Sequence, residues 1–220
     1  MNNDKNDSNV VKNTTPSVKP MKQDLNESDH DINGQETKPG TVMKYKLTWD
    51  LSGLKDIVIT DEMTQKGLSF SDDYDETRLN VTAKTKTDFT IVDDATKNSV
   101  VSETTVNWDE QAGKWRVVAN DPKAFLKEHA GHKLTIVFRP EVKDDAQGTL
   151  VNTASQNNFG QEYATETVKN NVTPNPKAPE TPNTGYGEKP KGGLYAAIAA
   201  ISFSLMAAIF YKPIKKWLKN

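Results

Sequence analysis

The chain has 220 residues and carries 28 lysines and arginines against 30 aspartates and glutamates, so its net charge at pH 7 is −2. A charge so close to neutral, with aromatic residues scattered along the chain, excludes the basic surface of a nucleic-acid-binding protein. The chain has no cysteine, which excludes disulfides and leaves a hydrophobic core, a metal or another crosslink to provide stability. Once the polar ends and the C-terminal tail are set aside, roughly 150 residues remain, enough for one domain.

Residues 1–18 are polar and lack the apolar stretch of a secretory signal peptide. Residues 8–16 (SNVVKNTTP) are similar to residues 166–174 (ETVKNNVTP), which close the folded region. We therefore expect residues 1–18 to be the disordered remnant of a preceding domain, in a chain that is a C-terminal fragment of a longer exported protein. Chance similarity in a chain rich in Thr, Asn and Val is the alternative interpretation.

From residue 41 onward, segments rich in β-branched and aromatic residues recur, with turns about ten residues apart. In residues 41–51 (TVMKYKLTWDL), Tyr45 and Leu47 would lie on one face of a strand, with Lys44 and Lys46 on the other. The spacing predicts an all-β fold, a two-sheet sandwich over residues 19–173. The expected strands are 41–51, 56–60, 68–70, 79–83, 88–92, 100–108, 114–119, 133–142, 149–156 and 162–172, with 100–108 and 114–119 as a hairpin.

One segment breaks the strand pattern. Asn120 or Asp121 can cap a helix, Pro122 suits its first turn, and Gly131 would end it. Residues 124–126 (AFL) would form the apolar side of this helix. We therefore expect one short helix within the sandwich.

The last part of the chain has the composition of a membrane anchor. Residues 174–193 form a proline-rich spacer, and residues 194–211 form an eighteen-residue run without a charge. As a helix, this run would be about 27 Å long, close to the thickness of the hydrocarbon core of a bilayer. Residues 212–220 form a basic tail that would stay in the cytoplasm, because lysines favour that side. We expect a transmembrane helix that holds the preceding residues outside the cell.

This order of segments resembles the cell-wall sorting signal of Gram-positive surface proteins, in which an LPxTG motif precedes an apolar span and a basic tail. The motif lies at residues 181–185, and Pro182, Asn183, Thr184 and Gly185 fit it, whereas Thr181 replaces the leucine. The resemblance implies that a sortase cuts between Thr184 and Gly185 and joins the chain to peptidoglycan. It therefore implies an extracellular, wall-anchored protein with a membrane-spanning precursor. A plain single-pass membrane anchor is the alternative.

Three stretches resemble the C-terminal domains of the streptococcal antigen I/II adhesin family and of related aggregation-type surface proteins. They are KYKLTWDL at residues 44–51, TQKGLSFSDDYD at residues 64–75, and VNTA…FGQEYATETVKNNV at residues 151–172. The resemblance covers about residues 20–174, and the chain is shorter than the larger family members between Tyr74 and Lys133. It implies an Ig-like sandwich of the DEv-IgG or Cna type, locked by an intramolecular isopeptide bond between a lysine and an asparagine.

By motif position, the resemblance assigns the isopeptide bond to Lys22 and Asn152, with Asp72 as the assisting acid. Burial in apolar surroundings lowers the pKa of a lysine and makes its amine nucleophilic. Burial also raises the pKa of a carboxylic acid, which can then polarise the asparagine carbonyl. The bond would close a loop of 130 residues, the difference between positions 152 and 22. An ordinary surface role is the alternative for Asn152.

The lysine and the acid also have competitors. Lys19 and Lys44 compete with Lys22, which could instead be an ordinary solvated lysine. Asp72 and Asp73 would point to opposite faces of a strand, so only one of them can enter the core.

Other sites are less clearly indicated, and no cofactor is expected. The acidic residues Asp72, Asp73, Asp75 and Glu76 could bind Ca²⁺, although they lack the glycine and the spacing of an EF-hand loop. A solvated acidic loop is the alternative. The three histidines, His30, His129 and His132, show no spacing that predicts a metal site.

Together these features predict a non-enzymatic stalk domain of a wall-anchored adhesin, whose partners are sortase, peptidoglycan and, before processing, the membrane. A host or bacterial surface ligand would bind the full-length protein. The alternative is a domain that itself binds such a ligand, for example a host glycoprotein or a partner bacterium.

Overall fold

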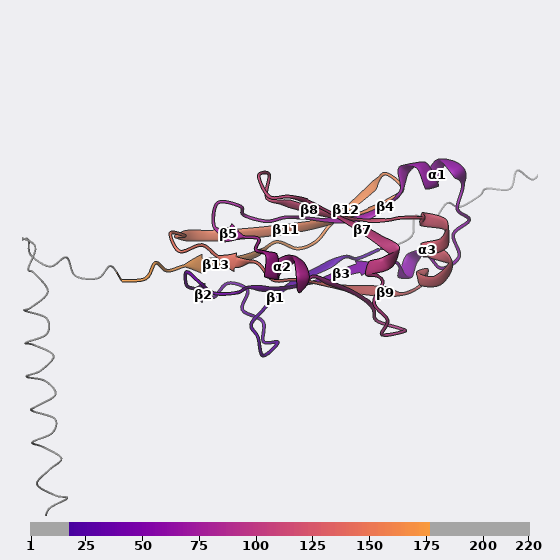
Figure 1. Ribbon diagram of the computed structural model, residues 1–220. Helices are drawn as coiled ribbons and strands as arrows, with labels where there is room; N and C mark the ends of the chain where they lie inside the picture. Colours follow the sequence, from indigo (N-terminus) through magenta and orange to yellow (C-terminus); the bar gives the residue numbers. More distant parts are fainter. Residues whose placement is uncertain (1–17, 177–220) are drawn as a thin grey trace, which may run out of the picture. The chain divides into compact units, whose positions relative to one another are not determined.

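The strands of residues 18–176, the part of the chain that the computed structural model describes, form two facing sheets (Figure 1). Several predictions lie outside these residues: the segment before residue 18, the sorting motif 181–185, the transmembrane helix 194–211 and the basic tail 212–220. Within residues 18–176, no helix is long and apolar enough to cross a membrane. The two-sheet sandwich expected from the strand spacing is confirmed.

The first sheet has four antiparallel strands in the order β1-β3-β9-β6. They are β1 (Met21–Leu25), β3 (Lys44–Asp50), β9 (Lys133–Phe138) and β6 (Thr90–Asp93). Tyr45, Leu47 and Trp49 of β3 are buried and the lysines between them are partly exposed, as the alternation in the sequence predicts.

The second sheet follows the order β2-β13-β11-β4-β8-β7, and β12 pairs with the far part of β11. All its pairs are antiparallel except that of β13 with β2. Its strands are β2 (Glu36–Thr37), β13 (Val168–Val172), β11 (Gly148–Asn158), β12 (Gln161–Ala164), β4 (Leu68–Asp73), β8 (Lys114–Ala119) and β7 (Thr104–Asp109). The predicted hairpin is formed by β7 and β8. A separate small pair joins β5 (Leu79–Asn80) to β10 (Glu141–Val142).

Large aromatic side chains from both sheets meet in the core. The ring centroids of Trp49 and Phe70 lie 6.3 Å apart, and those of Trp115 and Phe138 lie 5.7 Å apart. All four side chains are buried. Burying a side chain of phenylalanine size stabilises a fold by about 1.5–3 kcal/mol, so these contacts hold the sheets together.

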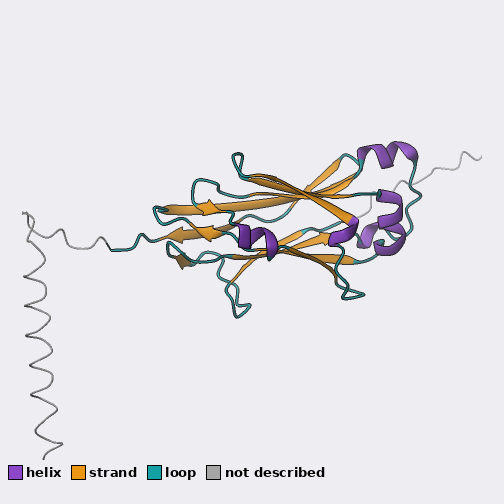
Figure 2. Ribbon diagram, in the orientation of Figure 1, coloured by secondary structure: helices purple, strands orange, loops and turns teal. Residues whose placement is uncertain are grey.

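The predicted helix is present as α3 (Pro122–His129), and Asp121 caps it by accepting hydrogen bonds from the backbone N–H groups of Lys123 and Ala124. The expectation of a single helix was wrong (Figure 2). The structure also contains α1 (Asp61–Lys66), α2 (Ala83–Thr87) and the 3₁₀ turns η1 (Ser52–Leu54) and η2 (Val101–Glu103). Thr60 and Thr82 cap α1 and α2 with their hydroxyls, and these short signals explain why each helix starts where it does.

The strand expected at residues 56–60 is also absent. Ile57 and Ile59 pack against the core and Val58 is 83% exposed, so the alternation seen in the sequence is real. No strand within residues 18–176 pairs with this segment, which instead connects η1 to α1. Alternation predicts which side chains face inward, but a strand also needs a neighbour for its backbone hydrogen bonds.

Two long predicted strands are each divided. Residues 133–142 become β9 and β10, separated by Arg139 and Pro140, because proline has no N–H to donate to a ladder. Residues 162–172 become β12 and β13, which pair with different parts of β11.

The described chain begins at the end of the sandwich that carries α3 and finishes at the opposite end, beyond β13 (Figure 1). At the first end, the backbone N–H of Lys19 donates to Asp50, and the N–H of Gly131 donates to the carbonyl of Leu51. At the other end, Thr173 donates its N–H to Thr37. The long axis of the strands therefore runs between the two ends of the described chain.

Candidate functional site

Three polar side chains from three strands meet between the sheets: Lys22 of β1, Asp72 of β4 and Asn152 of β11. Asp72 lies directly opposite Ala154 in the β4–β11 ladder, so Asn152 is its diagonal neighbour on the same inward face. Lys22 approaches from the other sheet. The structure thus brings together all three residues that the sequence analysis assigned to the crosslink.

Asp72 contacts both of the other side chains. The Lys22 amine donates to Oδ1 of Asp72, and Nδ2 of Asn152 donates to Oδ2 at 3.3 Å. The exposed fractions are 6% for Lys22, 1% for Asp72 and 0% for Asn152. The cluster is therefore dry, and its electrostatic interactions are stronger than they would be at the surface.

Burial shifts both titrating groups toward their neutral forms. It lowers the pKa of Lys22 to about 8, although the neighbouring Asp72 opposes this shift. It also raises the pKa of Asp72, although Lys22 opposes this. Because the two shifts act in opposite directions, proton transfer from the ammonium to the carboxylate costs far less here than in water. Both shifts therefore favour the uncharged amine and the uncharged acid.

Two buried atoms beside this pair have no hydrogen-bond partner within residues 18–176, Oδ1 of Asn152 and the hydroxyl of Tyr45. The Tyr45 ring lies under the Lys22 amine, with its centroid 4.8 Å from Nζ. An unsatisfied carbonyl oxygen in a dry core costs about 1–3 kcal/mol. The site therefore holds an acceptor that a neutral acid or a phenol can satisfy.

The structure separates the competing residues from this cluster. The Lys44 amine pairs with Asp29 at 2.5 Å, and the side chain of Lys19 is exposed. Asp73 is exposed on the other face of β4, where it lies 3.4 Å from the amine of Lys114. Among the residues considered, only Lys22 and Asp72 combine burial with contact to each other.

Asp24, which the sequence analysis did not single out, faces inward one strand period after Lys22. It is fully buried, and neither carboxylate oxygen has a hydrogen-bond partner in the described chain. Burial raises its pKa to about 7, although the neighbouring Asn170 amide opposes this shift. Asp24 lies two residues after Lys22 in β1, so the period of two places both side chains on the inward face, and this spacing could have identified Asp24.

The acidic run considered for Ca²⁺ does not converge on one point. Asp72 is bound in the core and Asp73 is exposed on the opposite face. Asp75 instead accepts hydrogen bonds from Thr77 and Arg78. Oxygen ligands for Ca²⁺ must surround a single position, which these side chains do not do.

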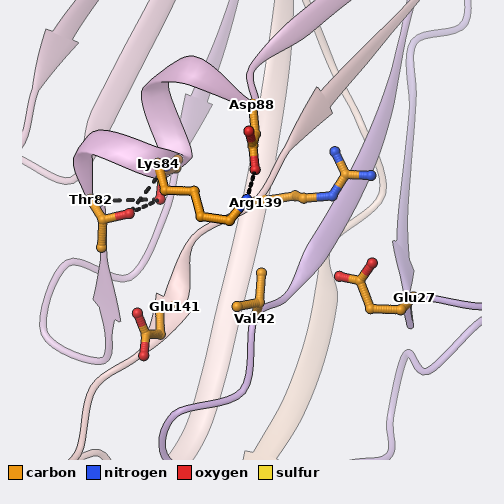
Figure 3. A pocket seen from close by; sticks show the side chains of 8 residues that line it. Glu27, Val42, Thr82, Lys84, Asp88, Arg139 and Glu141 are labelled. Atoms are coloured by element: carbon orange, nitrogen blue, oxygen red, sulfur yellow. Dashed lines mark hydrogen bonds and ion pairs between the residues drawn. The ribbon is translucent and has the colours of Figure 1, made fainter.

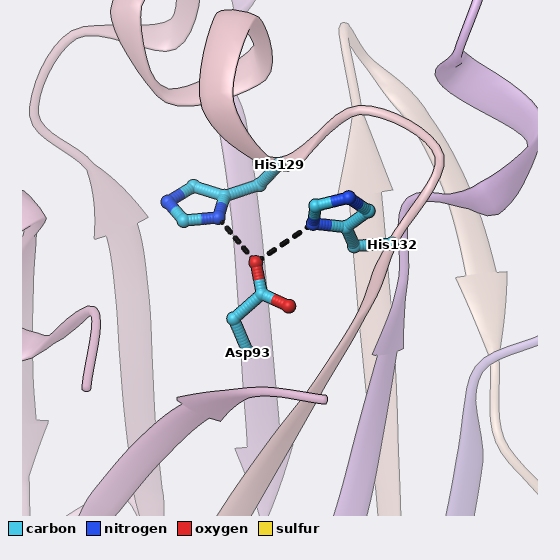
Figure 4. Close-up of side chains that lie close together, drawn as sticks. All are labelled: Asp93, His129 and His132. Atoms are coloured by element: carbon cyan, nitrogen blue, oxygen red, sulfur yellow. Dashed lines mark hydrogen bonds and ion pairs between the residues drawn. The ribbon is translucent and has the colours of Figure 1, made fainter. Parts of the chain in front are cut away.

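A second polar cluster lies at the end of β6, where Asp93 meets His129 and His132 (Figure 4). Oδ2 of Asp93 lies 2.7 Å from Nδ1 of His129 and 2.8 Å from Nδ1 of His132. Burial acts to raise the pKa of Asp93, but hydrogen bonds from the two histidines and from the backbone N–H groups of Ala95 and Thr96 outweigh it and lower the pKa to about 2. The sequence analysis missed this cluster because Asp93 is remote in sequence from both histidines.

The surface also has a shallow pocket of about 440 Å³ beside α2 (Figure 3). Its walls carry charges of both signs, including Lys84, Asp88 and Arg139, and Lys84 is paired with Asp88. Val42 provides a small apolar part of the lining. This pocket is open and mixed in charge, without the convergent buried groups of the Lys22 cluster.

Comparison with known proteins agrees with this fold. The family model of the cell surface antigen I/II C2 terminal domain matches residues 20–172. The aggregation substance of Enterococcus faecalis strain ATCC 700802 / V583 is 36% identical over 170 residues, which cover 76% of this chain and 13% of that protein. The chain therefore spans only a small part of this relative.

Solved structures of related domains show the same architecture. The C-terminal domain of the Streptococcus pyogenes antigen I/II-family protein AspA matches with a TM-score of 0.62 and 20% identity, over 71% of this chain and 53% of that one. The Streptococcus agalactiae AgI/II polypeptide BspA C-terminal domain matches with a TM-score of 0.60 and 26% identity, over 70% of this chain and 50% of that one. The sandwich and the match over residues 20–172 place this chain in the cell surface antigen I/II family, as a C2-type terminal domain of a surface adhesin.

Proposed function

We propose that this chain is a stalk domain of a Gram-positive surface adhesin and that Lys22 and Asn152 form an isopeptide bond without the help of an enzyme. The observation that carries the proposal is that Asp72 contacts the Lys22 amine and the Asn152 amide at once, in a dry interior. A permanent ion pair is the competing explanation. Burying such a pair costs several kcal/mol per ion before the attraction between them is counted, and the orphaned Oδ1 of Asn152 adds to that cost. Forming the bond replaces the charged amine with a neutral amide.

The reaction needs only these three side chains. Proton transfer from Lys22 to Asp72 gives a neutral amine and a neutral acid. A half-turn of the Asn152 amide then exchanges Nδ2 for Oδ1, so that the acid of Asp72 donates to the carbonyl oxygen. The Lys22 nitrogen attacks Cγ of Asn152, and the Cγ–Nδ2 bond breaks. Asp72 relays a proton from the attacking nitrogen to the leaving nitrogen, and the products are a secondary amide and ammonia.

The position of the bond suits a mechanical role. It would connect β1 of the first sheet to β11 of the second, across the core. Because the described chain enters and leaves at opposite ends of the sandwich, tension would run along the strands (Figure 1). The large hydrophobic side chains exposed within residues 18–176 belong to five different segments of the fold: Met21, Val42, Val58, Val101 and Val151. This distribution favours a spacer over a ligand-binding domain.

The intact mass of the purified protein tests the bond. The wild-type chain should be lighter than its sequence mass by one ammonia, and Lys22→Ala should have the full mass. Lys44→Ala is the matched control, because its amine pairs with Asp29 at the surface, and this variant should keep the deficit. A wild-type chain of full mass, or a deficit that survives in Lys22→Ala, would refute the crosslink.

Wall anchoring is a separate part of the proposal and rests on the motif at residues 181–185, followed by the apolar run 194–211 and the basic residues 212–220. A sortase would cut between Thr184 and Gly185 and transfer the Thr184 carbonyl to peptidoglycan. Cells that express the chain should carry it in the wall fraction, released by a muramidase with Thr184 attached to a wall fragment. Recovery of uncut chain in the membrane fraction would favour the plain single-pass anchor instead. This result would not affect the crosslink, which the mass measurement tests on its own.

A further inference from the structure

We propose that Asp93, His129 and His132 form a binding site for a divalent transition-metal ion of the zinc type. The three residues come from different parts of the fold: the last residue of β6, the last turn of α3 and the residue before β9. A bound ion would therefore fasten the C-terminal end of α3 to the edge of the first sheet. This role is independent of the Lys22 cluster and of the stalk proposal.

The donor set and its spacing suit such an ion. Two imidazole nitrogens and one carboxylate oxygen lie within 4.8 Å of one another (Figure 4). Zn²⁺ binds nitrogen and oxygen at about 2.0–2.2 Å in tetrahedral geometry, which needs ligand atoms roughly 3.3 Å apart. The two nitrogens lie 2.7 and 2.8 Å from Oδ2 of Asp93, so each of these two nitrogen–oxygen separations has to widen by only about half an ångström.

The strongest support for a metal ion comes from the two carboxylates that flank His129. Its Nδ1 faces Asp93 at 2.7 Å, and its Nε2 faces Oε2 of Glu103 at 3.0 Å. A neutral imidazole has one N–H, so it can donate to only one of these carboxylates and would leave a lone pair against the other. An ion at Nδ1 removes this conflict, because Nε2–H then donates to Glu103. Metal-bound histidines in proteins commonly donate their second nitrogen to a carboxylate in this way.

Backbone hydrogen bonds also orient the Asp93 carboxylate as a metal ligand. Its Oδ1 accepts hydrogen bonds from the backbone N–H groups of Ala95 at 2.8 Å and Thr96 at 3.3 Å. This fixes the plane of the carboxylate and leaves Oδ2 directed at the two histidines. Ligands oriented by outer hydrogen bonds in this manner bind an ion with little rearrangement.

The site is open on one side. The Asp93 side chain is fully buried and that of His129 almost so, whereas that of His132 is 30% exposed. An ion can therefore enter past His132, and water can complete a four-coordinate shell as the fourth ligand. The Phe125 ring packs against His129, with centroids 4.7 Å apart, and keeps the inner histidine in place.

Calorimetric titration of the purified, tag-free chain with Zn²⁺ in chelator-treated buffer tests the proposal. Wild-type protein should bind one equivalent saturably, and Co²⁺ in its place should give the absorption of a four-coordinate site with nitrogen ligands. His132→Ala should lose this binding. Glu103→Gln, which keeps all three ligands, should weaken it by about 10–100-fold. His30→Ala is the matched control and should bind like wild type, because the third histidine is exposed in a loop outside the cluster.

Two results would overturn the proposal. One is the absence of saturable binding by the folded wild-type chain, in which case His129 is an imidazolium that donates to both carboxylates. The other is equal binding by His132→Ala and wild type, which would place the ion elsewhere. If His132→Ala does not fold, Glu103→Gln decides, since unchanged affinity in that variant contradicts the assigned role of Glu103.

Discussion

The Lys22 cluster and the Asp93 cluster lie at opposite edges of the same four-stranded sheet, on β1 and β6, and combine similar groups differently. Around Asp72, a carboxylate meets an amine and an amide in a dry interior, and one amide oxygen is left without a partner. Around Asp93, a carboxylate meets two imidazoles at a position open to solvent, and both of its oxygens accept hydrogen bonds. The first arrangement is suited to a reaction that happens once, whereas the second is suited to reversible binding.

The largest effect is expected from removing the carboxylate at the centre of the interior cluster. Asp72→Ala should prevent the crosslink, so the protein should have its full sequence mass. Loss of a covalent loop of 130 residues should lower the free energy of unfolding by on the order of 4–5 kcal/mol by the chain-entropy account. Urea unfolding, compared with wild type, measures this. If Asp72→Ala keeps both the unfolding midpoint of the wild type and the mass deficit of one ammonia, Asp72 does not assist the bond.

The next effect concerns Asp24, the second buried carboxyl of β1. Because its pKa is raised from 3.8 to about 7, its protonated form stabilises the fold below pH 3.8, and this contribution is lost as the pH rises through about 7. The unfolding free energy of the wild type should therefore fall between pH 4 and 7, relative to Asp24→Asn, by at most about 4 kcal/mol.

Chemical unfolding of both proteins at several pH values across this window checks the prediction. Glu27→Gln, which changes an exposed carboxylate two residues after β1, should keep the pH dependence of the wild type. Parallel curves for wild type and Asp24→Asn would mean that Asp24 keeps an ordinary ionisation in the core.

A smaller effect tests whether the two clusters are independent. Zinc at a hundredfold excess over its dissociation constant should raise the unfolding free energy by about 2.7 kcal/mol. Because two strands, β3 and β9, lie between β1 and β6, the increment should be the same in wild type and in Asp72→Ala within about 0.5 kcal/mol. Thermal unfolding with and without a chelator measures it in both proteins. An increment that disappears in Asp72→Ala would mean that the clusters are coupled.

The smallest effect is expected for Asp73, the residue that follows Asp72 in the sequence. Asp73 is exposed and lies 3.4 Å from the amine of Lys114. Exposed ion pairs contribute about 0–1 kcal/mol, so Asp73→Ala should leave the unfolding free energy nearly unchanged and should keep the ammonia deficit. If Asp73→Ala instead had its full sequence mass, with no loss of ammonia, Asp73 and not Asp72 would be the assisting acid.

Sequence reasoning succeeded where one local rule was sufficient. Period-two alternation put Asp72 and Asp73 on opposite faces of a strand, and the cap at Asp121 with Pro122 in the first turn located α3. The resemblance to the antigen I/II family led to Lys22 and Asn152, which no periodicity would have brought together. That both are buried beside Asp72 is a result of the structure alone.

Sequence reasoning failed where contacts between distant segments decide which elements and sites form. Residues 56–60 alternate as a strand does, yet no strand in the described part of the chain, residues 18–176, pairs with them. Asp93 meets His129 and His132 only because β6 pairs with β9 in the fold. The carboxylate and the imidazoles are 36 and 39 residues apart, a separation that carries no periodic signal.

The position of Asn152 within β11 has a consequence for elasticity. A bond between Lys22 and Asn152 would turn residues 22–152 into a closed ring that cannot lengthen, whatever happens to its hydrogen bonds. Residues 153–176, which include β12 and β13, would remain outside the ring and be held by strand pairing and by the packing of Ala154, Val168 and Val172 in the core. Under a strong pull this segment could unravel and extend to a length of roughly 80 Å, at about 3.4 Å per residue. Such a domain would behave as a rigid link in series with a short extensible segment, and a sudden load would leave the connection between Lys22 and Asn152 unbroken.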